Sequence, residues 1–91
     1  MQFEWDSEKA QRNLIKHEVS FDDAATVFSD SLAVTIHDPD HSDQEQRFLT
    51  TGLSKRHRLI MVAHTDREGR VRIISAREVT AAERSQYESG E

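Results

Sequence analysis

The 91-residue chain contains no cysteine, one proline and three glycines. The absence of cysteine excludes disulfide bonds and thiolate-bound metal centres. No apolar run approaches the roughly 20 residues that a membrane-spanning helix needs, and the first six residues carry charge where a signal peptide needs an apolar segment. The sequence therefore predicts a cytoplasmic protein that folds as one domain over residues 1–91.

Charge is distributed unevenly along the chain. The formal net charge is −5, which argues against a protein that coats nucleic acid with its whole surface. Residues 1–54 carry −7, from eleven carboxylates and four cations, whereas residues 55–91 carry +2, from six carboxylates and eight cations. Seven of those eight cations are arginines, whose planar guanidinium groups match phosphate. The C-terminal part is therefore interpreted either as a solvated surface or as a phosphate-binding region.

Three helices are expected from capping residues and from apolar residues at helical spacing. The second is the best marked, because Ser20 is followed three residues later by Asp23 in a variant of the capping box, and Val19 can pack against Ala24. We expect helices from residue 6 or 7 to about 17, from 20 to about 28, and from 80 to 87.

Between the second and third helices the apolar period changes from that of a helix to that of a strand. Strands are expected over residues 32–36, 45–53, 58–65 and 70–76, joined by short connections that favour an antiparallel meander. Phe3 and Trp5 alternate with polar residues as in a further short strand. The expected fold class is α+β: two N-terminal helices, a four-stranded antiparallel meander and a C-terminal helix, with the helices on one sheet face. The other face is left to solvent or to a partner.

Two arginines of the last expected strand are candidates for binding phosphate. Arg72 lies in the middle of the strand, where a cation is costly unless it meets water, a carboxylate or a phosphate. Arg77 lies just past the strand end, where functional groups are often presented. The structural alternative for Arg72 is an ion pair with Glu4, Glu45 or Glu78. The sequence favours neither interpretation over the other.

Metal binding is not expected. Two histidines, His37 and His41, flank Asp38 and Asp40, a composition that can bind a metal ion but that suits a solvated turn better. No cofactor is expected either.

An ordered set of motifs runs over nearly the whole chain. The motifs are Phe3-Glu4-Trp5-Asp6, Lys9-Ala10, Asn13, Lys16-His17, Val19-Ser20-Phe21, Val27-Phe28, Asp40-His41-Ser42, Glu45, Arg47, Gly52, Thr65-Asp66-Arg67, Arg72-Ile73-Ile74-Ser75-Ala76-Arg77, Thr80, Glu83-Arg84 and Tyr87-Glu88. In this order and at this spacing the set resembles the BrnT toxin family. One departure is Glu18, where BrnT sequences commonly have Gly after Lys-His.

The resemblance implies a RelE-like fold and the toxin of a type II toxin–antitoxin system. We therefore expect an endoribonuclease that is neutralised in a hetero-oligomer by a BrnA-like antitoxin, which also binds operator DNA. Because the chain has no cysteine and no convincing set of His and carboxylate ligands, we expect cleavage to be independent of metal ions. Without the resemblance, the residues alone favour a non-catalytic module that binds RNA or an acidic protein segment on a cationic sheet face.

RNA cleavage without a metal needs a base, an acid and cations that offset the charge developing at the phosphate. We expect the catalytic residues to be Arg72, Arg77, Arg67 and His17, and the RNA-binding residues to be Lys16 and Arg47. His17 is the first candidate for proton transfer because it follows Lys16 at the end of a helix, although the helix dipole also explains a cation there. The other groups left open for proton transfer are His41, His64, Glu45, Glu78 and Tyr87.

Overall fold

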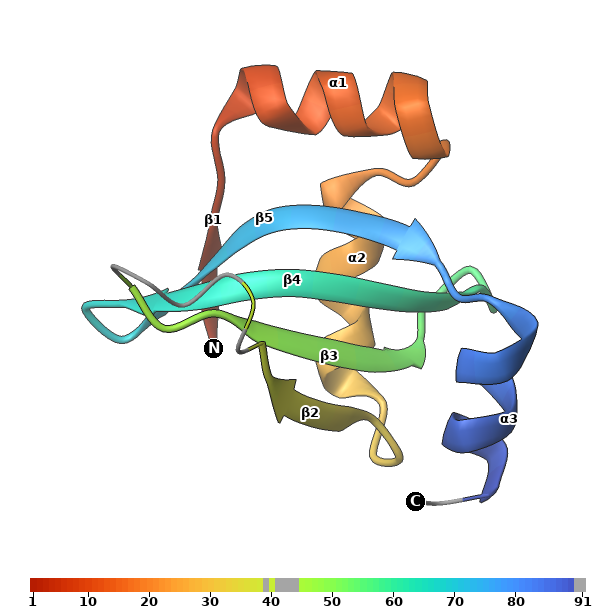
Figure 1. Cartoon of the computed structure of the whole chain (residues 1–91). Helices are drawn as coiled ribbons and strands as arrows, with labels where there is room; N and C mark the ends of the chain where they lie inside the picture. The colour runs from red at the N-terminus through yellow and green to blue at the C-terminus, as the bar shows by residue number, and fades with distance from the viewer. Residues whose placement is uncertain (39, 41–44, 90–91) are drawn as a thin grey trace.

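The computed structural model describes residues 1–38, 40 and 45–89, which form a sheet with helices on both sides (Figure 1). The expected α+β class is confirmed, and each expected helix and strand is present to within a few residues. None of the described helices has the length and apolar character to cross a membrane. Along the chain the elements are β1 (Gln2–Glu4), α1 (Ser7–His17), α2 (Phe21–Thr26), the 3-10 helix η1 (Val27–Ser29), β2 (Val34–His37), β3 (Phe48–Leu53), β4 (Leu59–Arg67), β5 (Arg70–Glu78) and α3 (Ala81–Ser89).

The sheet is mixed and has five strands in the order β1-β5-β4-β3-β2. Strands β2 to β5 form the expected antiparallel meander, but β1 extends it, parallel to β5, so the prediction of a four-stranded antiparallel sheet is wrong. β1 is held by contacts on both of its faces. Phe3 packs against Phe28 with ring centroids 5.3 Å apart, and Glu4 forms ion pairs with Arg70 and Arg72.

Helix α2 covers one face of the sheet and closes the core. The Ser20 hydroxyl accepts a hydrogen bond of 3.0 Å from the backbone N–H of Asp23, as the capping pattern predicts. Apolar side chains from the start of α2, from η1 and from β4 and β5 then pack together. The buried members of this core are Val19, Phe21, Ala24, Val27, Ile60, Val62, Val71, Ile73 and Ala76.

Glu18 ends α1 in the left-handed backbone region, with φ 58° and ψ 32°. Glycine is the usual residue in this conformation because a Cβ atom is strained there, so Glu18 occupies a position that favours Gly. The guanidinium of Arg58 donates a hydrogen bond of 2.6 Å to the Glu18 carbonyl and holds the turn in place.

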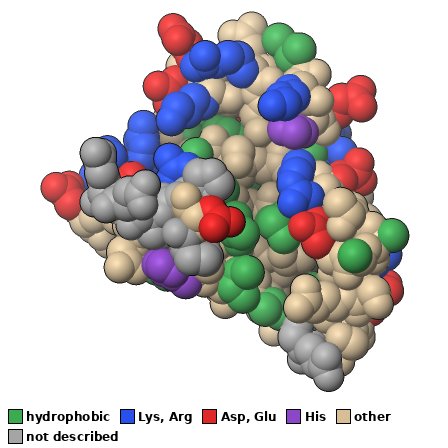
Figure 2. Space-filling model, in the orientation of Figure 1, with side chains coloured by type: hydrophobic (Ala, Val, Ile, Leu, Met, Phe, Trp, Pro, Cys, Tyr) green, Lys and Arg blue, Asp and Glu red, His purple; other side chains and the backbone are tan. Residues whose placement is uncertain are grey.

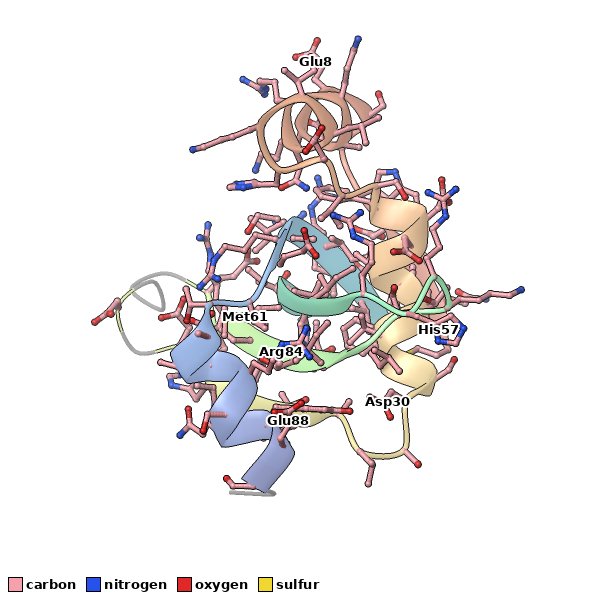
Figure 3. The ribbon with its side chains drawn as sticks, turned by 90° about the vertical axis from the view of Figure 1, so that its right-hand side faces the viewer. Glu8, Asp30, His57, Met61, Arg84 and Glu88 are labelled. Carbon is pink, nitrogen blue, oxygen red and sulfur yellow. The ribbon has the colours of Figure 1, made fainter. Side chains whose placement is uncertain are left out.

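Helix α3 lies on the opposite side of the sheet from α2, so the expectation that the helices share one face is wrong (Figure 3). Its N-terminus carries the expected capping box, in which Thr80 and Glu83 exchange hydrogen bonds between side chain and backbone. None of its residues is buried, and polar contacts attach it to the sheet. Near its end, the Tyr87 hydroxyl donates a hydrogen bond of 2.6 Å to Asp30.

Candidate nucleic-acid interface

The arginines of β5 are paired with carboxylates. Glu4 accepts hydrogen bonds from Arg70 at 2.8 Å and from Arg72 at 2.9 Å, and both contacts hold the pKa of Glu4 below its usual value. Arg77 forms a two-point ion pair with Glu83, at 2.8 and 2.9 Å, and this guanidinium lowers the Glu83 pKa to about 2. The cationic sheet face expected from the sequence is thus largely neutralised by the chain's own carboxylates.

Arg72 forms an ion pair with Glu4, one of the structural alternatives predicted for it. It does so through one nitrogen only. Nη1 donates to Glu4, whereas Nε and Nη2 donate to no group in the described part of the chain. Its side chain is 27% exposed, and the guanidinium is near enough to Asp6 to contribute to the lowered pKa of that carboxyl, after the backbone hydrogen bonds from Lys9 and Glu8. Arg67 lies at the exposed end of β4 with Glu45 at 3.4 Å, and Arg47 lies just before β3, away from β5 in the sheet order.

Helix α1 lies beside the second half of β5 and bonds to its backbone there. β1 pairs only with residues 70–72, so beyond Arg72 this edge of β5 has no strand partner. Asn13 fills the gap: its side-chain amide donates 2.8 Å to the Ala76 carbonyl and accepts 3.1 Å from the Ala76 N–H. The same amide also donates 3.0 Å to the Val19 carbonyl. The sequence marked Asn13 only as part of a motif, and its bonding to a strand 63 positions away has no local signal.

This anchoring turns a row of cations on α1 toward β5. Lys9, Arg12, Lys16 and His17 are spaced so that they share one side of the helix. Together with Asn13, Ile74 and Ser75 they line a shallow depression, which we call the cationic groove. Ile74 reaches the groove because the β4–β5 pairing is irregular there: His64 faces Ile73 and Ala63 faces Ser75, so Ile74 has no cross-strand partner.

Among the residues that the structure describes, no carboxylate lines the cationic groove. Lys9, Arg12 and Lys16 are exposed, and within the described residues none of them forms an ion pair. Figure 2 shows Lys and Arg side chains gathered around α1 and the adjoining part of β5. Lys9, Arg12 and Lys16 therefore form an accessible cationic row in the N-terminal half of the chain, although the charge totals pointed to the C-terminal half. Helical spacing of Lys9, Arg12 and Lys16 is the signal that would have revealed it.

His17 is the histidine that the fold brings to the groove, where it is half-buried next to Lys16. His37 and His57 are exposed elsewhere, and His41 lies outside the described residues. His64 is 6% exposed between Phe28 and Phe48, and its Nε2 is 2.7 Å from the Thr50 hydroxyl. Burial lowers the His64 pKa and keeps the ring neutral, so His64 belongs to the core.

The buried ring makes stability depend on pH. Because the His64 pKa is lower in the folded than in the unfolded chain, the unfolded chain binds the extra proton first as the pH falls. We expect the free energy of unfolding to fall below about pH 6.5, by up to about 1.4 kcal/mol per pH unit for this one proton. Chemical denaturation between pH 7.5 and 5 measures it. His64→Gln should flatten the profile in this window, and a wild-type profile that is already flat would refute the assignment.

The other groups considered for proton transfer are poorly suited to it. The hydrogen bond to Asp30 raises the Tyr87 pKa to about 12, so Tyr87 is a weak acid. Glu78 lies on the surface 3.1 Å from Arg58, and Glu45 lies beside Arg67. Neither lines the cationic groove.

Metal ligands do not gather in the part of the chain that the structure describes: no three His, Asp or Glu side chains there could hold one ion. The loop with His37, Asp38, Asp40 and His41 lies partly outside the described residues.

The sequence matches a family of toxins from type II toxin–antitoxin systems. The family model described as the ribonuclease toxin BrnT of type II toxin–antitoxin systems matches residues 5–83, and the chain belongs to this family. The crystal structure of the Brucella abortus ribonuclease toxin BrnT superimposes with a TM-score of 0.65 at 24% sequence identity, over 88% of this chain and 97% of that one. No curated protein shows significant sequence similarity to the chain.

Proposed function

We propose that this member of the BrnT ribonuclease family is an endoribonuclease that binds and cuts RNA in the cationic groove between α1 and β5. The observation that carries the proposal is the composition of that groove. Three exposed cations and one histidine of α1 line it, with no carboxylate among the described lining residues. The arginines of β5, in contrast, are paired with Glu4 and Glu83. RNA supplies the complementary row of phosphates.

The cations bind and position the RNA backbone. Lys9, Arg12 and Lys16 follow one another at intervals of three and four residues on α1. The Cβ atoms of neighbours at this spacing lie about 5–6 Å apart, which is close to the distance between successive phosphates of a single RNA strand. Arg72 extends the row through Nε and Nη2. We assign further backbone contacts to Arg77, Arg67 and Arg47, with Arg77 held in a fixed orientation by Glu83.

His17 supplies the proton transfer. A neutral imidazole takes the proton from a ribose 2′-hydroxyl, whose oxygen attacks the adjacent phosphorus. The new oxygen–phosphorus bond forms as the bond to the 5′-oxygen breaks, and the imidazolium returns its proton to that oxygen. The products are a 2′,3′-cyclic phosphate and a 5′-hydroxyl. Lys16 and Arg12 offset the negative charge that develops on the phosphate during attack.

We also propose that cleavage is independent of metal ions, since the described lining of the groove presents three cations and no carboxylate, and the amide oxygen of Asn13 is already bound to the Ala76 N–H. Purified protein should degrade RNA at the same rate with and without a chelator. A loss of cleavage on chelation that one particular divalent metal restores would refute the metal-free mechanism.

Three further predictions accompany this function. We propose that the antitoxin implied by the family is BrnA-like, that the toxin forms a hetero-oligomer with it, and that the pair acts in the cytoplasm. The relation to RelE-like toxins stays a prediction, because the similarity to the Brucella structure shows the fold alone. If the protein binds RNA in the groove but releases it intact, the chain is instead a non-catalytic binding module.

A further inference from the structure

The sheet face opposite α2 carries an apolar groove. Val34 and Ile36 of β2, Leu49 of β3 and Met61 of β4 form its floor, and α3 forms one wall through Tyr87. Ile36 is 55% exposed, although a β-branched aliphatic residue on a sheet face is normally covered. Figure 2 shows hydrophobic side chains open to solvent over the middle of this face, below the cluster of Lys and Arg.

Helix α3 covers this face only in part. It has no buried residue, and its described side-chain contacts to the body are the Arg77–Glu83 ion pair and the Tyr87–Asp30 hydrogen bond. Figure 3 shows α3 beside Met61, on the side of the sheet away from α2. The apolar floor therefore faces a gap that a further polypeptide can fill.

The apolar groove and the cationic groove adjoin each other across the sheet. One row of cross-strand partners runs from Ile36 through Leu49 and Ala63 to Ser75. Side chains in such a row lie on the same face, and Ser75 at its end also lines the cationic groove. A segment that crosses the sheet along this row meets aliphatic side chains first and the cations of α1 last.

We propose that the antitoxin docks along this row, with aliphatic side chains in the apolar groove and carboxylates in the cationic groove. The proposal rests on the proposed function in one respect: the second contact covers the RNA-binding cations. Interface size supports the use of both grooves. A stable complex buries about 800 Å² per partner, and the eight residues that line the apolar groove fall short of the roughly 20–30 residues that such an interface takes on each side.

The two contacts have different roles. A few side chains anchored in a desolvated, well-packed groove carry most of the affinity of a typical interface. Carboxylates opposite Lys9, Arg12 and Lys16 speed association and weaken with salt, and they also exclude RNA phosphate by competition. Neutralisation then follows from occupancy of the cationic groove, without any change in the toxin's own fold.

The test uses the antitoxin encoded beside this chain's gene, and the variant Ile36→Glu. A carboxylate on this exposed side chain leaves the fold and the cationic groove intact, so RNA cleavage should stay at the wild-type rate. Affinity for the antitoxin should fall about thirtyfold or more, and coexpression should no longer rescue growth. The matched control is Leu32→Glu, since Leu32 is 72% exposed and does not line the groove.

Hydrogen exchange on the complex supplies the second measurement. Binding should protect amides of β2, β3 and α1, and this readout does not depend on whether the chain cuts RNA. Protection confined to other surfaces, or full antitoxin affinity in Ile36→Glu, would overturn the proposal. So would failure of the wild type to bind that antitoxin, or a wild-type dimer that Ile36→Glu dissociates while antitoxin binding is unchanged.

Discussion

Replacement of His17 by Gln is expected to lower the rate of RNA cleavage by a factor of about 10²–10⁴, the usual contribution of a positioned general base. Glutamine keeps a polar side chain of similar length but cannot take the 2′-hydroxyl proton. His17 is half-buried at the end of α1, where neither its neighbours nor the helix requires a titratable ring, so the melting temperature should change little.

The matched control is His57→Gln, because His57 is exposed in the β3–β4 turn and lies outside the groove. Single-turnover cleavage of a labelled RNA measures both variants. Equal activity of the two variants would show that another group removes the proton.

Asn13→Ala is expected to destabilise the fold by about 3–4 kcal/mol. The substitution leaves three backbone groups without partners, the carbonyls of Val19 and Ala76 and the Ala76 N–H, and each buried group left unsatisfied costs about 1–3 kcal/mol. A small domain has only about 5–15 kcal/mol of stability in total. The loss is therefore a large fraction of the free energy of unfolding.

Urea denaturation of Asn13→Ala beside Gln11→Ala measures this effect. Gln11 is exposed on the same helix and makes no side-chain hydrogen bond in the described structure, so its replacement should change stability by less than about 0.5 kcal/mol. If Asn13→Ala is as stable as Gln11→Ala, then α1 is held to β5 by other contacts and the groove does not depend on the amide.

The sequence predicted the helices and the meander well because the features that determine them lie within a few neighbouring residues. The Ser20 cap, the Thr80–Glu83 box and the alternation in the strands act over a few residues, and the structure contains all of them. β1 was underrated because its stability comes from Phe28, Arg70 and Arg72, far away in the sequence. The position of α3 depends on Asp30 in the same way.

The surroundings of the candidate site residues could not be predicted from the sequence, because a total of charge over a segment does not show how the fold pairs its members. Arg72 and Arg77 stood out in the sequence, and the structure gives each a carboxylate. Lys9 and Arg12 drew no attention in an acidic half of the chain, yet they line the groove with Lys16 and His17. Of the site residues named from sequence, His17 and Lys16 are the two that the fold places in this groove.

The most direct test is the salt dependence of RNA binding by a triple variant, Lys9→Gln, Arg12→Gln and Lys16→Gln, with a single-stranded RNA whose 2′-hydroxyls are methylated so that it cannot be cut. Its control is Lys55→Gln, Arg56→Gln and Arg84→Gln, which removes the same charge from exposed positions outside the groove. A plot of log K against log salt has a negative slope, and each lost phosphate contact reduces its magnitude by about 0.7. The magnitude should therefore fall by about 2 in the groove variant and hardly at all in the control. Equal slopes in the two variants would show that RNA binds elsewhere on the protein.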